Sequence, residues 1–583
     1  MQSNGATTIS TNDRQNYCAA LFSNCIKTKN LKMGRALHSH LIKTALLLDT
    51  FLVNRLIQMY SKCNSMDCAQ KAFDELPFKN THSWNTMISV HCQMGSFGKA
   101  RRLLDEMPEP NLVSYNSIIS SFGRSGFYKK AISVFRGMQK WSQGDVLIDE
   151  FTFVSLTNAC AGLAALELLR QVHGVAIVMR LDFNVVVCNA LVDAYGKCGV
   201  PESSYWIFSR MEEKDVVSWT SMVVAYASAS RLEDACLIFN QMPVRNAVSW
   251  TALIKGSVQN GDGEGALSLF REMQNKAVIA NDITFVSVLS ACADLALIGM
   301  GKQLHCHIIR IRSSSVFDNV FVVNALIDMY SKSGNMISSM RLFDRLHGKD
   351  IITWNSVITG FAQNGHGEAS LSVFQKMIQE NVRPNDVTFI GVLTACSHSG
   401  LESEALRFLD MMKKKFGLIP RSDHYAILVD LLGRKNRLKE ALEVIERAPS
   451  GSDHIGMWGA LLATCRVHGN LELAKRAAEA LFELEPKNTG RYVMLSNIYA
   501  TAGRWDDSHR IRRLIDNMDL KKAAGSSWIE VKNARRMFVA EDVFQSQVED
   551  IQELLLNLVN QMKDVGYMHI EEPFYSEEWS ALI

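Results

Sequence analysis

The stretch VSWTALI at residues 248–254 returns in close variants along most of the chain. The variants are SWNTMIS from Ser83, SYNSIIS from Ser114, SWTSMVV from Ser218 and TWNSVIT from Thr353. Two further phrases recur in the same way: VNRLIQMYSK from Val53 returns from Cys188 and Val323, and FTFVSLTNAC from Phe151 returns from Ile283 and Val387. Self-similarity at this spacing predicts a tandem array of small structural repeats.

Counting the aromatic residue as position 4 sets the start of each repeat. The starts are Gln15, Thr50, Thr81, Leu112, Glu150, Val185, Val216, Ala247, Asp282, Val320, Ile351, Asp386 and Ser422. Apolar residues follow helical spacing in both halves of a repeat, as Trp250, Leu253 and Ile254 do in the first. Position 28, where a second helix should stop, holds Pro77, Pro108, Pro243 and Pro449. Each repeat is therefore predicted to be an antiparallel helix pair, and the fold to be all-α.

Composition sets broad limits. The 583 residues carry a net charge of +2, which neither indicates nor excludes a nucleic-acid partner, because a local face decides binding. No run of about 18 apolar residues occurs, so we expect no membrane span. The 13 cysteines include no C-x-x-C pair, so we predict no metal site and no cofactor. Cys25, Cys160, Cys292 and Cys396 share one place in related repeats and should be buried packing residues.

The ends of the chain depart from the repeat pattern. Residues 1–14 are polar and are interpreted as a leader or the remnant of a targeting segment. Residues 454–522 form two further helix pairs with tetratricopeptide-like spacing. In 523–566, Ile529 and Val531 alternate with polar neighbours, which predicts a short β-hairpin, and a helix should follow from about Gln545 to Lys563. Residues 567–583 form an acidic, aromatic tail.

With these phrases laid out, the chain from Gln15 to about Tyr567 resembles plant pentatricopeptide repeat proteins of the P-L-S subclass. The SWN and SWT phrases resemble P-type or short repeats, VNALIDMYSK the S-type and FTFVSLTNAC the L-type. Residues 15–453 would hold thirteen such repeats, 454–522 two E-type repeats and 523–566 an E-plus-like extension. The resemblance implies a right-handed superhelical α-solenoid that binds single-stranded RNA in a plant organelle and selects a cytidine for editing to uridine.

Eight repeats carry polar residues both at position 5 and at their last position. These RNA-reading pairs are Asn54/Asn80, Asn85/Asn111, Asn116/Asp149, Asn189/Asp215, Thr220/Asn246, Thr251/Asn281, Asn324/Asp350 and Asn355/Asn385. Amides donate and accept, whereas carboxylates only accept, so such pairs can distinguish base edges. The alternative for the last residues is helix N-capping alone, and for position 5 it is tolerance of a polar residue.

Position 2 is apolar and would clamp bases. It holds Phe51, Val113, Phe151, Val186, Val217, Val248, Ile283, Phe321 and Ile352, and His82 departs from the pattern. In L-type repeats Ala19, Val154, Val286 and Ile390 hold position 5 and cannot hydrogen-bond a base, so these repeats are spacers or weak readers. The family's code then implies the RNA n-C-C-U-n-U-A-A-n-U-C, with n for unread positions.

Deamination needs a zinc-bound water with H-x-E and C-x-x-C ligands. His569-Ile570-Glu571 matches H-x-E in letters, but no cysteine follows Cys465, so we expect no deaminase (DYW) domain and no enzyme activity. A deaminase acting in trans and other editing factors would dock on 454–566. Trp458, Trp505 and Trp528 are candidate anchors, although core positions are the favoured interpretation.

Two alternatives stay open. The first is an organellar RNA processing, splicing or stabilisation factor, which would use the same pairs. The second is a protein-binding helical-repeat scaffold. Family frequency favours the mitochondrion, with the chloroplast as the alternative.

Overall fold

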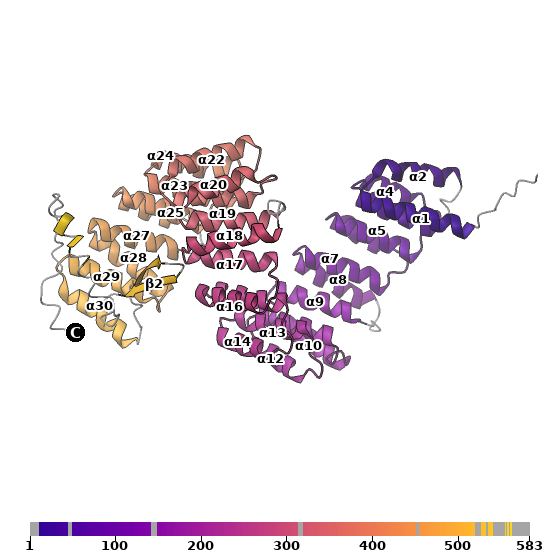
Figure 1. Ribbon diagram of the computed structural model, residues 1–583, viewed down its shortest axis with the longest axis horizontal. Helices are drawn as coiled ribbons and strands as arrows, with labels where there is room; N and C mark the ends of the chain where they lie inside the picture. Colours follow the sequence, from indigo (N-terminus) through magenta and orange to yellow (C-terminus); the bar gives the residue numbers. More distant parts are fainter. Residues whose placement is uncertain are drawn as a thin grey trace, which may run out of the picture. The chain divides into compact units, whose positions relative to one another are not determined.

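Helices α1 to α30 and a two-stranded sheet make up the described part of the chain (Figure 1). The computed structural model describes residues 11–44, 49–141, 148–312, 319–449, 454–518, 526–531 and 534–539, together with a few positions between 554 and 562. The chain divides into an N-terminal part, residues 1–291, and a C-terminal part, residues 292–583. The division falls inside α17 (Asp282–Asp294).

The N-terminal part is a stack of helix pairs. The first helices of its repeats are α1 (Thr11–Thr28), α3 (Thr50–Lys62), α5 (Thr81–Gln93), α7 (Leu112–Arg124), α9 (Glu150–Gly162), α11 (Val185–Lys197), α13 (Val216–Ser228) and α15 (Ala247–Gln259). The second helices are α2 (Leu31–Lys43), α4 (Met66–Asp74), α6 (Phe97–Glu106), α8 (Tyr128–Trp141), α10 (Leu166–Val178), α12 (Pro201–Arg210), α14 (Leu232–Gln241) and α16 (Gly263–Asn275). Each first helix contacts the next first helix, as α5, α7 and α9 do in Figure 1.

The C-terminal part continues the same construction. Its first helices are α19 (Val320–Lys332), α21 (Ile351–Gln363), α23 (Asp386–Ser399), α25 (Ser422–Arg434), α27 (Ile455–His468) and α29 (Thr489–Thr501). Its second helices are α18 (Ile298–Arg312), α20 (Met336–Arg345), α22 (Gly367–Gln379), α24 (Glu402–Lys414), α26 (Leu438–Glu446), α28 (Leu471–Leu484) and α30 (Trp505–Asn517). Strands β1 (Ser526–Val531) and β2 (Ala534–Val539) pair antiparallel, with Trp528 opposite Met537.

The helix starts agree closely with the repeat pattern. From Thr50 to Ser422, every first helix begins at the residue from which its repeat was counted. The exception is α1, which begins at Thr11 rather than Gln15, so the predicted leader overlaps a helix. Helices α4, α6, α14 and α26 end before the prolines at position 28, because proline lacks the backbone N–H that would continue the ladder. The predicted all-α fold of antiparallel helix pairs is confirmed, as is the β-hairpin.

A recurring aromatic contact joins successive repeats. The position-4 tryptophan of a first helix meets a phenylalanine of the preceding second helix nearly edge-on. Centroid distances are 4.7 to 5.2 Å in the pairs Phe73–Trp84, Phe208–Trp219, Phe239–Trp250 and Phe343–Trp354. Edge-to-face packing places the positive ring edge against the negative face. Trp250 and Trp354 are buried, so this contact forms part of the core between repeats.

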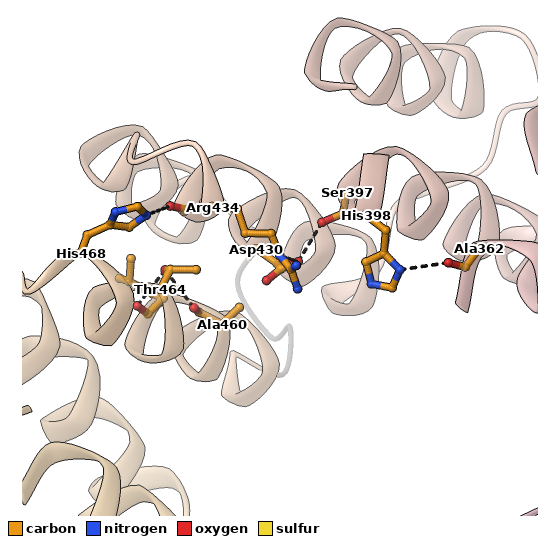
Figure 2. A network of polar contacts seen from close by, with 10 residues as sticks. Ala362, Ser397, His398, Asp430, Arg434, Ala460, Thr464 and His468 are labelled. Carbon is orange, nitrogen blue, oxygen red and sulfur yellow. Dashed lines mark hydrogen bonds and ion pairs between the residues drawn. The ribbon is translucent and has the colours of Figure 1, made fainter. Parts of the chain in front are cut away.

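The far ends of the first helices are tied to the preceding repeat by side chains (Figure 2). His398 Nδ1 lies 2.9 Å from the carbonyl oxygen of Ala362, and His468 Nε2 lies 2.9 Å from that of Gly433. A carbonyl only accepts, so each ring nitrogen donates. Asn364 Nδ2 donates in the same way to Ser331, at 2.9 Å. Each of these carbonyls also accepts a backbone N–H from just beyond its helix, so the side chain adds a second donor near the helix C-terminus.

The four equivalent cysteines are buried as expected, each at most 1% exposed. The tryptophans behave differently. Trp505 is 47% and Trp528 44% exposed, so the core interpretation was wrong for both, and Trp458 is half-buried. Trp528 lies on β1 of the two-stranded sheet, and Trp505 is the first residue of α30. Of the predicted helix 545–563, most residues lie outside the described residues, as do the tail and the leader up to residue 10.

Candidate nucleic-acid interface

In each of the eight repeats with a polar pair, the last residue caps the helix that follows it. In all eight repeats its side-chain oxygen accepts the backbone N–H at position 3 of the next first helix, at 2.8 to 3.0 Å. Such caps satisfy one of the four free N–H groups at a helix start. The capping role is therefore real for Asn80, Asn111, Asp149, Asp215, Asn246, Asn281, Asp350 and Asn385.

The same residues also contact position 5 of the preceding first helix. The position-5 Nδ2 donates to the last residue's Oδ1 in five pairs, at 3.0 to 3.3 Å, although 26 to 33 residues separate the partners. These pairs are Asn85/Asn111, Asn116/Asp149, Asn189/Asp215, Asn324/Asp350 and Asn355/Asn385. In these five repeats the last residue both caps the next helix and accepts a hydrogen bond from position 5, so the two residues form a direct pair.

The other three pairs lack a direct side-chain bond between their two described residues. Thr220 and Thr251 turn their hydroxyls back to the carbonyls of Val216 and Ala247, at 2.7 and 2.6 Å. Asn54 has a buried Oδ1 that makes no hydrogen bond within the described protein. A threonine hydroxyl is shorter than an amide, and it finds its own helix carbonyl first.

The pairs are less open than the sequence suggested. Five position-5 residues are only 4 to 9% exposed, namely Asn54, Asn189, Thr251, Asn324 and Asn355. Asn85, Asn116 and Thr220 are half-buried. The last residues are half-buried or exposed, with Asn80, Asn111, Asp215 and Asn246 the most open. The next first helix covers position 5, so each repeat offers a narrow polar edge rather than two free side chains.

An exposed apolar side chain stands at position 2 in seven of the eight repeats with a polar pair, and His82 stands there in the repeat of Asn85. The position-2 residues are 46 to 70% exposed; they are Phe51, Val113, Phe151, Val186, Val217, Val248, Ile283, Phe321, Ile352 and Val387. Positions 2 and 5 lie three apart, on one face of a helix. An apolar surface and a hydrogen-bonding edge therefore recur together, which suits a planar aromatic ligand with a polar rim.

The pair Asn324/Asp350 offers one donor and one acceptor. Asp350 Oδ1 accepts the Asn324 amide at 3.1 Å and the Thr353 backbone N–H at 2.8 Å. Burial opposes ionisation of Asp350, but the hydrogen bonds from Thr353 and Asn324 outweigh it and lower its pKa. The residue is therefore a carboxylate that only accepts. One Asn324 N–H and Asp350 Oδ2 stay outside these bonds.

The pair Asn355/Asn385 offers two donors instead. Asn385 Oδ1 accepts the Asn355 amide at 3.1 Å and the Thr388 backbone N–H at 3.0 Å. Its Nδ2 group stays outside these bonds, next to the second N–H of Asn355. An aspartate-to-asparagine change at the last position thus replaces an acceptor by a donor, while the hydrogen bonds to position 5 and to the next helix are kept.

Basic residues directly before the last residues contact the core next to the polar pairs, and the repeat pattern alone did not single them out. Lys79, Lys214, Arg245 and Lys349 each place their charge 5.0 to 5.3 Å from the centroid of the phenylalanine that meets the position-4 tryptophan. Lys349 Nζ also donates to the carbonyl of Leu346, at 3.0 Å. The sequence signal that could have revealed them is the basic residue that recurs one position before the capping residue. They hold the loop that carries the last residue of the repeat.

Basic residues also gather at position 13, eleven residues after position 2 and on the same helix face. They are Lys27, Lys62, Arg124, Lys197, Lys332 and Arg434. Eleven residues correspond to about three turns, or roughly 16 Å along the helix. Lys197 and Arg124 line a polar cavity of about 290 Å³ with Ser120 and Asn158. Cations at this distance from the polar edges suit a ligand with a repeating negative charge.

In the described ranges, no three His, Cys, Asp or Glu side chains are grouped as metal ligands would be. The sequence His569-Ile570-Glu571 lies outside those ranges. None of the described helices combines the length and apolar character that crossing a bilayer requires.

Comparison with known proteins gives the chain its family. The PPR repeat family matches residues 110–162, 245–294 and 349–398, and the PPR repeat matches 82–112, 186–216, 217–246, 321–351 and 387–415. The E motif matches residues 468–530, which overlap the predicted E-type segment.

Full-length relatives agree. One pentatricopeptide repeat-containing protein of Arabidopsis thaliana is 38% identical over 96% of this chain and 76% of its own length. Another is 47% identical over 93% of this chain and 90% of its own. Among solved structures, maize PPR10 in complex with an 18-nt psaJ RNA element is 16% identical, with a TM-score of 0.42 over 87% of this chain and 93% of its own. The chain therefore belongs to the pentatricopeptide repeat family and carries an E motif.

Proposed function

We propose that this protein binds single-stranded RNA sequence-specifically, with each reading repeat contacting one base. The observation that supports this most is the hydrogen-bonded frame of Asn324 and Asp350, which leaves one donor and one acceptor beside exposed Phe321. Stacking on an apolar side chain and hydrogen bonding on the base edge are the two means by which proteins read unpaired bases.

The groups left open fit the expected bases. Uracil carries an N3–H donor beside carbonyl acceptors, so it complements the carboxylate and amide N–H of Asn/Asp pairs. Cytosine carries acceptors at N3 and O2, so it complements the two donors of Asn355 and Asn385. For Thr/Asn pairs, adenine is assigned from the family's code alone. The proposed target is n-C-C-U-n-U-A-A-n-U-C, with position-13 cations contacting phosphates.

We further propose that the protein selects a cytidine for conversion to uridine in a plant organelle and recruits a deaminase in trans through residues 454–566. The E motif in this region supports a role beyond RNA binding. Its Arabidopsis relatives include one named as mitochondrial and one, CRR2, named as chloroplastic, so either organelle is consistent with the family.

Fluorescence anisotropy with the 11-nucleotide RNA tests the binding proposal. Replacing the two adenines by cytosines should weaken binding by at least about tenfold, since each mismatched base costs on the order of 1 kcal/mol or more. Equal affinity for both RNAs would contradict the assignment. A protein that binds neither RNA above a scrambled control would point to the scaffold alternative.

Transcript sequencing separates editing from the other RNA roles. Loss of the protein should leave at least one organellar cytidine unconverted, a few nucleotides 3′ of a matching site. Normal conversion at every site, together with altered splicing, ends or abundance, would favour processing, splicing or stabilisation instead.

A further inference from the structure

We infer that the hydroxyl at position 3 of a repeat is a positioning residue that sharpens base selection by the preceding repeat. The inference rests on the proposed function. In four successive-repeat contacts, this hydroxyl lies 2.6 to 2.7 Å from the position-5 Asn Oδ1. The contacts are Ser114–Asn85, Thr152–Asn116, Thr353–Asn324 and Thr388–Asn355.

The hydroxyl completes a grip on both ends of the amide. One N–H of Asn324 goes to Asp350, and its carbonyl oxygen lies 2.7 Å from the hydroxyl of Thr353, which also lies 2.8 Å from Asp350 Oδ1. We assign the single hydroxyl hydrogen to Asn324, the nearer acceptor, because Asp350 Oδ1 already accepts two N–H groups. A flipped amide would place its oxygen against the carboxylate. Only the second N–H is left for a base, so the edge presented by Asn324 is fixed before RNA arrives. Such preorganisation strengthens discrimination because less ordering is needed on binding.

Burial makes the grip hard to replace. Thr353 and Thr388 are fully buried, so solvent is a poor substitute for their hydroxyls. The backbone N–H of Thr353 makes the cap at Asp350 and is kept in any variant, while the hydroxyl also lies 2.8 Å from the same carboxylate oxygen. Valine has nearly the same shape as threonine, and Thr353→Val should therefore remove the hydroxyl with little change in helix capping.

The chain contains its own comparison. The pair Asn189/Asp215 has the same two side chains as Asn324/Asp350, and Ser218 Oγ lies 2.9 Å from Asp215 Oδ1 as Thr353 Oγ1 lies 2.8 Å from Asp350 Oδ1, but the Ser218 hydroxyl makes no bond to Asn189. Asn189 Oδ1 is buried and makes no hydrogen bond within the described protein. Two repeats assigned to uracil thus differ in this contact. Uracil should be preferred over cytosine more strongly at the tenth nucleotide, opposite Asn324, than at the sixth, opposite Asn189.

The test compares dissociation constants of the full-length protein for the 11-nucleotide RNA with uracil or cytosine at the tenth nucleotide. In Thr353→Val the preference for uracil should fall at least about threefold, the weight of one hydrogen bond. Thr353→Ser keeps the hydroxyl and should restore the preference. Ser218→Ala is the matched control and should leave the preference at the sixth nucleotide unchanged.

An unchanged preference in Thr353→Val, or equal losses in the Val and Ser variants, would overturn the inference. If Thr353→Val does not fold, Thr388→Val provides the same test at the eleventh nucleotide, where cytosine should lose its advantage. A wild-type protein without any preference for this RNA would overturn the proposed function itself. A base preference that the wild-type protein shows and the valine variant retains would overturn only the inference about the hydroxyl.

Discussion

The indole ring of Trp250 meets the phenyl ring of Phe239 edge-on, with centroids 4.7 Å apart and planes at 71°. The guanidinium of Arg245 lies 5.1 Å from the centroid of Phe239, and the next residue, Asn246, caps the helix that carries Trp250. Core packing and the reading residue are therefore parts of one local structure. Loss of the ring should loosen the loop as well as the core.

Trp250→Ala should lower stability by about 3 to 5 kcal/mol, as expected for removal of a large buried aromatic side chain. Thermal unfolding followed by circular dichroism measures this effect. The exposed Trp505, 47% accessible, provides the control, because Trp505→Ala removes the same ring without opening a cavity. Equal shifts in melting temperature would contradict the packing role of Trp250.

Asp350→Asn should change base preference without unfolding the protein. Asparagine caps helices as well as aspartate does, so the melting temperature should stay within a few degrees. The pair would then present two donors, and the tenth nucleotide should shift from uracil toward cytosine, by about 1 to 3 kcal/mol. Anisotropy titrations with both RNAs measure the shift. Asp423→Asn removes an equal charge outside the pairs and should leave the base preference unchanged. An Asp350→Asn variant that still prefers uracil at the tenth nucleotide would refute the pairing scheme.

Lys62→Ala should weaken binding equally for matching and mismatched RNA. Lys62 is an exposed position-13 cation, and a phosphate contact carries no sequence information. The slope of log affinity against log salt should fall by about 0.7, the value for one phosphate of a single strand. Lys71→Ala, an exposed lysine on a second helix, should leave the slope unchanged. A sequence-dependent loss would argue for base contact instead.

Stability should decrease as the pH falls below about 6.5, the ordinary pKa of histidine. Burial lowers the pKa of His38, His173 and His305, whose rings lie 2.9 to 3.1 Å from tyrosine hydroxyls. Below pH 6.5 the histidines of the unfolded chain bind protons, whereas those of the folded chain stay neutral. The stability of the fold is therefore full above pH 6.5 and decreases as the pH falls from there to the lowered pKa of the folded state. Melting temperatures from pH 7.5 to 5.5 should fall less in the triple glutamine variant. An equal fall would exclude these rings as the cause.

Thiol reactivity should separate buried from exposed cysteines. Burial raises the pKa of Cys160 to about 11 and that of Cys396 to about 12, whereas Cys306 is exposed. The thiolate is the reactive form, so Cys306 should be alkylated first by iodoacetamide at pH 7.5. Mass spectrometry of peptides follows the order. Comparable rates at Cys160 and Cys306 in the native protein would contradict the burial.

The repeat phrases predicted the helix starts well because capping and aromatic packing recur at the same positions in each repeat. Residue 350, for example, precedes a helix that begins at Ile351, as counted. The sequence did not predict that position 5 is nearly covered, because that depends on how closely the next repeat packs. Nor did it predict which hydroxyl reaches which amide: Ser218 and Thr353 hold equivalent positions and both contact the carboxylate of the preceding last residue, yet only Thr353 also reaches the position-5 amide oxygen. Residue type likewise did not predict that Trp505 and Trp528 are exposed, because exposure depends on what packs against each ring.

One side chain at each repeat boundary both starts a helix and borders the proposed reading edge, as Asp350 and Asn385 do. The last position of a repeat therefore tolerates only the few residue types that can cap a helix. Aspartate and asparagine both qualify, and they differ only by an amide for an acid. Under the proposed function, a conservative replacement at this position would change the preferred RNA while the helix start and the fold are kept.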